Sequence, residues 1–200
     1  MARPVIFDLG GVLIDWDPRH LYRKLFGDEA AMETFLAEIC SPEWNQRQDE
    51  GRSFAAGVAE LTARHPEHRE MIEAYHARWP EMLAGALDDT VAILAELNAR
   101  GQPLYALSNW SAETFPHARA RFDFLGWFRG LVISGEEGIK KPSPAIFHLL
   151  FQRYSIDPAE AVFIDDSQAN VTAARSIGLE ALRFTSATTL REDLGRLEIL

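Results

Sequence analysis

The chain of 200 residues is 47% hydrophobic and 25% charged, a composition typical of a globular protein that forms one domain or a core domain with a smaller insertion. Its formal net charge of −10 argues against nucleic acid and against an anionic membrane surface as partners, because both are bound by basic faces. The lack of a membrane-spanning run, of a signal-peptide pattern and of any cysteine besides Cys40 predicts a cytoplasmic protein without a disulfide framework or a cysteine-based metal site.

Short apolar runs bounded by turn residues are the predicted strands, at residues 5–7, 104–107, 131–133, 162–164 and 181–184. None of them alternates polar and apolar residues, which is the pattern of strands buried on both faces of a sheet. Helical patterns lie between them, at residues 90–100, 143–154 and 168–177. Strands that alternate with helices predict an α/β fold with a parallel sheet and helices on both of its faces.

One interval, residues 15–85, breaks this alternation. It contains helical patterns and Pro/Gly punctuation, but no apolar strand run. It is also too long to be the single helix that connects two parallel strands. We therefore expect an inserted helical subdomain at residues 15–85 and a core that combines residues 1–14 with residues 86–200.

Polar side chains follow four of the predicted strands. The carboxyl ends of the strands in an open α/β sheet build its ligand site, so we expect these side chains to converge. They are Asp8 after the first strand, Ser108 and Asn109 after the second, Lys140 and Lys141 after the third, and Asp165 and Asp166 after the fourth.

The segments VIFDLGGVL, LSNW, KKP and FIDDSQAN, in this order, resemble the four motifs of the haloacid dehalogenase-like (HAD) hydrolase superfamily. The resemblance covers nearly the whole chain. In motif pattern it is closest to the branch that contains α-D-glucose-1-phosphate phosphatases. It implies a Rossmann-like core, a helical cap of the C1 type at residues 15–85, and Mg²⁺-dependent hydrolysis of a small phosphate ester.

The resemblance also implies catalytic and phosphate-binding roles. Asp8 would be the nucleophile, because a carboxylate that forms an aspartyl-phosphate divides one difficult step into two easier ones. Lys141 would contact both the phosphate and the nucleophile with its compact ammonium group. Ser108 and Asn109 would donate hydrogen bonds to phosphate oxygens.

A magnesium site is implied at the same place. Adjacent carboxylates such as Asp165 and Asp166 repel each other unless a cation lies beside them, and Mg²⁺ prefers oxygen ligands. The implied ligands are Asp8, Asp166 and the backbone carbonyl of Gly10, with Asp165 binding directly or through water.

Gly10 departs from the family pattern. Most phosphatases of this superfamily carry a second aspartate there, which serves as general acid and base and contributes about 10²–10⁴-fold to the rate. Two hypotheses follow from its absence. Either a residue near the start of the insertion substitutes for it, with Asp15, Asp17 and His20 as candidates, or the substrate has a good leaving group, as anomeric sugar phosphates do.

We therefore predict a Mg²⁺-dependent phosphatase that acts on a small phosphorylated metabolite, with a sugar 1-phosphate as one candidate. A 2-haloacid dehalogenase is the first alternative, although dehalogenases of this superfamily have an aromatic residue where Gly10 stands and lack an acidic pair like Asp165-Asp166. A catalytically silent phosphate-binding protein is the second, supported only by Gly10. Trp16 and Trp110 would suit a sugar in the cleft, but a structural role is the favoured interpretation of both.

Overall fold

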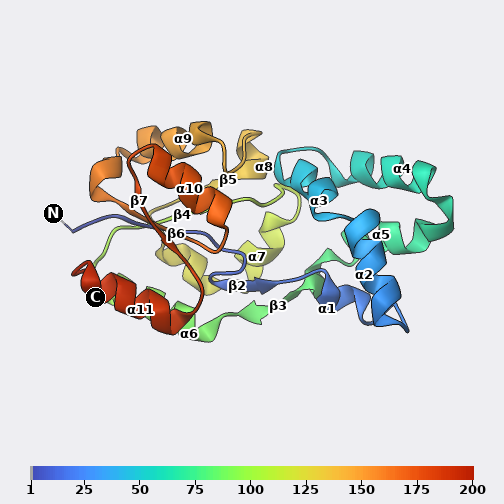
Figure 1. Ribbon diagram of the computed structural model, residues 1–200, viewed down its shortest axis with the longest axis horizontal. Coiled ribbons are helices and arrows are strands. Elements are labelled where there is room, and N and C mark those ends of the chain that lie inside the picture. Colours follow the sequence, from blue (N-terminus) through green and yellow to red (C-terminus); the bar gives the residue numbers. More distant parts are fainter. Residues whose placement is uncertain (1) are drawn as a thin grey trace.

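A five-stranded parallel sheet forms the core of the protein in the computed structural model, which describes residues 2–200 (Figure 1). The strand order is β5-β4-β1-β6-β7, so β1 is central. The strands are β1 (Val5–Phe7), β4 (Leu104–Ser108), β5 (Gly130–Ile133), β6 (Val162–Asp165) and β7 (Glu180–Arg183). The predicted α/β fold with a Rossmann-like parallel sheet is confirmed, and each predicted strand agrees with an observed one to within one residue at either end.

Both faces of the sheet are buried, as the unbroken apolar runs require. Val5 and Phe7 of β1 belong to one hydrophobic cluster, and Ile6 between them belongs to the other. Helices α9 (Pro144–Tyr154) and α10 (Gln168–Ser176) cover the face of Ile6, whereas α6 (Asp88–Ala99) and α11 (Ala187–Arg196) cover the opposite face (Figure 1).

The three predicted helices of the core are confirmed to within two residues at each end. Ser143 shows why one of them begins where it does, because its hydroxyl accepts a hydrogen bond from the Ala145 backbone N–H. The segment after the third predicted strand, expected as a loop, begins instead with the short helix α8 (Ser134–Glu137). The other elements of the core are α7 (Phe115–Arg121) and the 3₁₀ helices η3 (Asp123–Trp127) and η4 (Pro158–Glu160). None of the described helices is both long and apolar enough to cross a membrane.

The helices of the predicted insertion lie beyond the carboxyl ends of the sheet strands (Figure 1). They pack around aromatic side chains of their own, and Tyr75 contacts both Tyr22 and Trp44, with ring centroids 6.2 and 4.9 Å away. We call residues 19–82 the helical insertion. Its elements are α1 (Arg19–Tyr22), α2 (Glu29–Glu38), α3 (Pro42–Asp49), α4 (Phe54–Arg64), η1 (Pro66–His68), α5 (Arg69–Ala77) and η2 (Trp79–Met82).

The expectation that residues 15–85 contain only helices is wrong at both ends of this interval. Strands β2 (Ile14–Trp16) and β3 (Leu83–Ala86) pair with each other as a separate antiparallel sheet. They carry the chain out of the core and back into it. Neither gives a strong strand signal, because β2 has only three residues and β3, with the sequence LAGA, has few residues that favour strands.

Candidate active site

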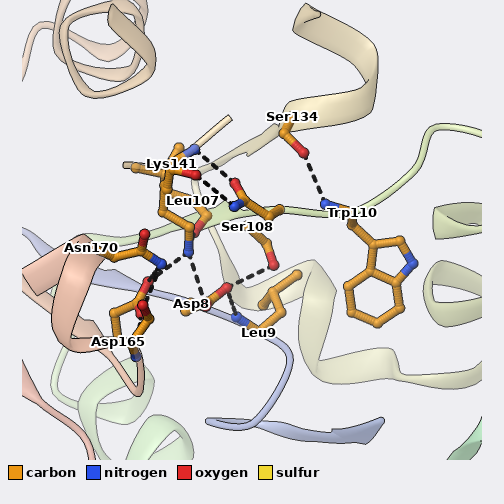
Figure 2. Close-up of polar contacts among 11 residues, drawn as sticks. Asp8, Leu9, Leu107, Ser108, Trp110, Ser134, Lys141, Asp165 and Asn170 are labelled. Atoms are coloured by element: carbon orange, nitrogen blue, oxygen red, sulfur yellow. Dashed lines mark hydrogen bonds and ion pairs between the residues drawn. The ribbon is translucent and has the colours of Figure 1, made fainter. Parts of the chain in front are cut away.

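The carboxyl ends of the strands bring the predicted polar side chains together. Asp8 follows β1, Ser108 ends β4 and Asp165 ends β6, while Lys141 reaches them from the segment between α8 and α9 (Figure 2). Asp8, Ser108, Lys141 and Asp165 are all buried. These residues therefore meet at the carboxyl ends of the strands, as expected.

Lys141 is the centre of this cluster. Its Nζ lies 2.9 Å from Asp8 Oδ2 and 2.7 Å from Asp165 Oδ2, and it donates a third hydrogen bond of 2.8 Å to the Leu107 carbonyl (Figure 2). Burial lowers the pKa of Lys141, but the charges of the two carboxylates outweigh burial and raise the pKa above its usual value. The ammonium group is thus charged at neutral pH and has all three N–H donors in use.

Asp8 is held from several directions. Its Oδ1 accepts hydrogen bonds of 2.7 Å from the Leu9 backbone N–H and from the Ser108 hydroxyl, and its Oδ2 faces Lys141. Burial raises the pKa of Asp8 to about 7, Lys141 acts in the opposite direction, and the charge of Asp165 adds to the increase. The carboxylate is therefore fixed in orientation and sensitive to any further positive charge placed beside it.

Two asparagines position the charged residues. The Asn109 side chain accepts from the Lys141 backbone N–H at 2.8 Å and donates to the Lys141 carbonyl at 2.9 Å, so it fixes the backbone that carries the lysine. Asn170, in α10, donates to both oxygens of Asp165 at 3.1 and 3.0 Å. Asn170 is a positioning residue that was not among the residues predicted for the site. The signal was its place five residues after Asp165, in the first turn of the helix that follows β6.

The two carboxylates of the acidic pair have different surroundings. Asp165 is fully buried, and besides Lys141 and Asn170 it accepts a 2.7 Å hydrogen bond from the Ser167 backbone N–H. Asp166 lines the cleft and is far more exposed than Asp165, and the partial burial of its carboxyl, together with the charge of Asp165, raises the pKa of Asp166. Oxygens of Asp8, Asp165 and Asp166 all lie within 4.8 Å of one another, which is close enough to hold one metal ion.

The two glycines after Asp8 differ in the space around them. Gly11 has a φ of +74°, and a Cβ built on it would lie 2.6 Å from Asp166 Oδ2, so only glycine leaves this carboxylate in place. A Cβ built on Gly10 meets no atom within 4 Å. The backbone therefore does not require glycine at position 10, and a side chain would fit there.

The cluster opens into a cleft of about 1020 Å³ that is lined by residues of both the sheet ends and the helical insertion. Of the three predicted substitutes for the missing acid, only Asp17 lines it. Asp15 and His20 are paired with each other instead, with 2.9 Å between Asp15 Oδ1 and His20 Nε2.

A family model described as haloacid dehalogenase-like hydrolase matches residues 3–178. The chain belongs to this family. It is accordingly an enzyme of the hydrolase class, as the motifs at the strand ends predicted.

Curated relatives and solved structures are similar over most of the chain. Sesquiterpene phosphatase astK of Aspergillus oryzae is 24% identical over 98% of this chain and 96% of its own length. Fructose-1-phosphate phosphatase YqaB of Escherichia coli is also 24% identical, over 89% of this chain and 94% of its own. The HAD family enzyme bt-2542 of Bacteroides thetaiotaomicron, solved in complex with magnesium and inorganic phosphate, has a TM-score of 0.69 at 23% identity and covers 92% of this chain and 95% of its own. This last similarity supports the fold.

Proposed function

We propose that this HAD hydrolase is a Mg²⁺-dependent phosphatase that transfers the phosphoryl group of a small monoester to Asp8 and then to water. The observation that carries the proposal is the cluster of Asp8, Lys141 and Asp165, with Asp166 beside it at the wall of the cleft. The phosphatase names of relatives such as fructose-1-phosphate phosphatase support the same reaction class.

The donors at the cleft fit a magnesium ion. We take the side chains of Asp8 and Asp166 and the carbonyl of Gly10 as its direct ligands, because all three residues line the cleft. Asp165 does not line it, and its oxygens already accept from Lys141, Ser167 and Asn170, so we give it an indirect role. A bound Mg²⁺ would neutralise the carboxylates and polarise the phosphate.

The residues of the chain then have distinct tasks. In the first step an oxygen of Asp8 bonds to phosphorus as the ester P–O bond breaks, and in the second step water attacks phosphorus and releases Asp8. Lys141 and the Ser108 hydroxyl hold the orientation of Asp8 throughout. Because Lys141 is already bound to three acceptors, its main contribution is to keep Asp8 ionised and aimed at the cleft.

A hydroxylated substrate suits the inner part of the cleft. A small cavity of about 50 Å³ is lined by Gly10, Asn45, Asp49, Asn109 and three tryptophans, Trp16, Trp79 and Trp110. The Asn45 amide and the Asp49 carboxyl can form hydrogen bonds with the hydroxyls of a sugar or polyol, and the indole rings suit the apolar face of such a ligand. The name of one relative, fructose-1-phosphate phosphatase, supports the same substrate class. We therefore favour a sugar or polyol phosphate, including 1-phosphates.

A dehalogenase is disfavoured by the same residues. An exposed carboxylate such as Asp166 beside the nucleophile fits a cation and a phosphate better than it fits a haloacid, whose own carboxylate it would repel. Similar folds do occur among dehalogenases, for example in L-2-haloacid dehalogenase from Xanthobacter autotrophicus, with a TM-score of 0.65 at 19% identity over 100% of this chain and 85% of its own. The fold alone therefore does not separate the two activities.

The proposed function is tested by phosphate release from sugar 1-phosphates, sugar 6-phosphates, polyol phosphates and acyl phosphates. We expect turnover with Mg²⁺, loss of turnover with EDTA, and recovery when excess Mg²⁺ is added back. Undiminished turnover of metal-stripped protein would contradict the magnesium requirement. Release of halide from 2-haloacids without any phosphatase activity would replace the proposal by the dehalogenase alternative.

Substituting Gly11→Ala tests the magnesium ligand. The new methyl group would collide with Asp166 Oδ2, so we expect the Mg²⁺ concentration for half-maximal activity to rise by about 10-fold or more. Gly101→Ala is the matched control, because Gly101 has the same φ of +74° but no atom within 4 Å of its Cβ. Equal Mg²⁺ requirements for the two variants, measured by titration of activity, would rule out Asp166 as a ligand.

A further inference from the structure

Gly10 leaves the phosphatase reaction without the side chain that would protonate the leaving oxygen, so another acid at the cleft would have to supply the proton. Those outside the strand ends are Asp17, Glu33, Glu43 and Asp49. Asp17 and Glu33 both bind Arg19, and hydrogen bonds lower the pKa of both Glu33 and Glu43. Glu33 and Glu43 are thereby disposed to stay ionised, Asp17 is engaged with Arg19, and Asp49 is the exception.

Asp49 lies where the missing group would act. It is the last residue of α3, and it lines the small inner cavity together with Gly10 and Asn109. Gly10 leaves room for a side chain at the wall of this cavity, since a Cβ on Gly10 meets no atom within 4 Å. The helical insertion thus presents a carboxyl group to the place that the core leaves open.

The backbone of Asp49 is attached to the core. The Ser134 hydroxyl donates to the Asp49 carbonyl and accepts from the Trp110 backbone N–H at 2.9 Å, and Figure 2 shows the second of these contacts. Ser134 is fully buried. Asn45 also donates to Asp49 Oδ2 at 3.0 Å, which orients the carboxyl group. A side chain held by two elements in this way has a defined position relative to the nucleophile.

We propose that Asp49 is the general acid and base of this active site, a proposal that rests on the phosphatase function above. As an Asp8 oxygen bonds to phosphorus and the ester P–O bond breaks, protonated Asp49 gives its proton to the leaving oxygen, which departs as a neutral alcohol. Ionised Asp49 then takes a proton from the water that attacks phosphorus, the bond from phosphorus to Asp8 breaks, and inorganic phosphate leaves.

The surroundings of Asp49 suit both tasks. Burial raises the pKa of Asp49 to about 7, against a hydrogen bond from the Ser111 backbone N–H and the charge of Lys140, which both lower it. Tyr75, whose hydroxyl is neutral, is a further titratable group near the Asp49 carboxyl. A carboxyl that titrates near neutral pH is able to donate and accept a proton within one catalytic cycle.

The decisive experiment compares leaving groups in Asp49→Asn. We expect kcat/KM for the best sugar or polyol phosphate to fall by about 10²–10⁴-fold, because an alkoxide leaves poorly without a proton. For p-nitrophenyl phosphate, which needs no proton on its leaving group, we expect kcat/KM to fall less than about 10-fold. The wild-type kcat/KM for the sugar phosphate should also decline as pH rises through about 7, and this decline should be absent from the variant.

Glu50→Gln is the matched control, because Glu50 is the next carboxylate in the chain and does not line the cleft. Its activity should equal that of the wild type on both substrates. The double variant Gly10→Asp/Asp49→Asn supplies a rescue. Because it has an acid at position 10, its activity on the sugar phosphate should be at least about 10-fold higher than that of Asp49→Asn.

Equal losses on both substrates in Asp49→Asn, or no loss on either, would overturn the role of Asp49 and leave the proposed phosphatase function in place. Wild-type protein that releases phosphate from no substrate would overturn the proposed function itself. A variant that merely misfolds is recognised separately by its melting temperature.

The melting temperature gives a prediction of its own. Because the folded-state pKa of Asp49 lies near 7 and its unfolded value near 4, the unfolded chain ionises first as pH rises, and folding stability falls between pH 4 and 7. The substitution Asp49→Asn removes this loss of folding stability, because an asparagine side chain does not ionise. The variant should melt several degrees above the wild type at pH 8 and at the same temperature near pH 4. A lower melting temperature at pH 8 would show that the Asp49 carboxylate stabilises the fold.

Discussion

Replacing Asp8 by asparagine is expected to reduce phosphate release by at least about 10⁴-fold, the scale of loss when a covalent nucleophile is removed. The substitution keeps the size of the side chain and an oxygen that accepts from Leu9 and Ser108. It removes the negative charge that attacks phosphorus and that pairs with Lys141. The measurement is single-turnover phosphate release with saturating Mg²⁺.

The control for this variant is Asp15→Asn, which changes a carboxylate of β2 that does not line the cleft. Its activity should stay close to that of the wild type. If Asp8→Asn kept more than about one tenth of the activity, the nucleophile would have to be another residue.

Replacing Lys141 by methionine is expected to lower both stability and activity. The change leaves the carboxylates of Asp8 and Asp165 buried without a counter-charge, and removing one partner of a buried ion pair costs about 3–5 kcal/mol. For a chain of this length that corresponds to a melting temperature lower by about 10 °C. Phosphate release should be lost as well, because the charge that keeps Asp8 ionised and helps to orient its Oδ2 is removed.

A second substitution separates the two effects. In Lys141→Met/Asp165→Asn one of the unpaired carboxylates is neutral, so part of the lost stability should return while the activity should not. Lys140→Met is the control, because Lys140 Nζ pairs with Gln46 and Glu50 at the surface. A Lys141→Met protein as stable as Lys140→Met would contradict the charge balance derived for the cluster.

The sequence predicted the parallel sheet and its convergent strand ends because both depend on local patterns. Apolar runs without alternation identify doubly buried strands, and parallel topology places Asp8, Ser108 and Asp165 at one edge wherever the connecting helices lie. Strands β2 and β3 escaped prediction because they are short and pair with each other, outside the main sheet.

The contribution of the insertion could not be predicted from spacing. Asp49 lines the same small cavity as Gly10, and the Ser134 hydroxyl at the start of α8 binds the Asp49 carbonyl at the end of α3, a contact between residues 85 positions apart. Distance in sequence favoured Asp15, Asp17 and His20 as substitutes for the missing acid, yet Asp15 and His20 pair with each other instead. Proximity along the chain is a poor guide where an insertion packs against the core that it interrupts.

The central claim is that the phosphoryl group passes through Asp8, and trapping the intermediate tests it most directly. Wild-type protein is mixed with an excess of acyl phosphate and Mg²⁺, and the reaction is quenched in acid within the first turnover. The protein is then digested, and the masses of its peptides are determined by mass spectrometry. We predict one phosphoryl group on the peptide that contains Asp8, absent from Asp8→Asn. Phosphate release without any phosphorylated peptide, or a phosphoryl group on another residue, would contradict the account.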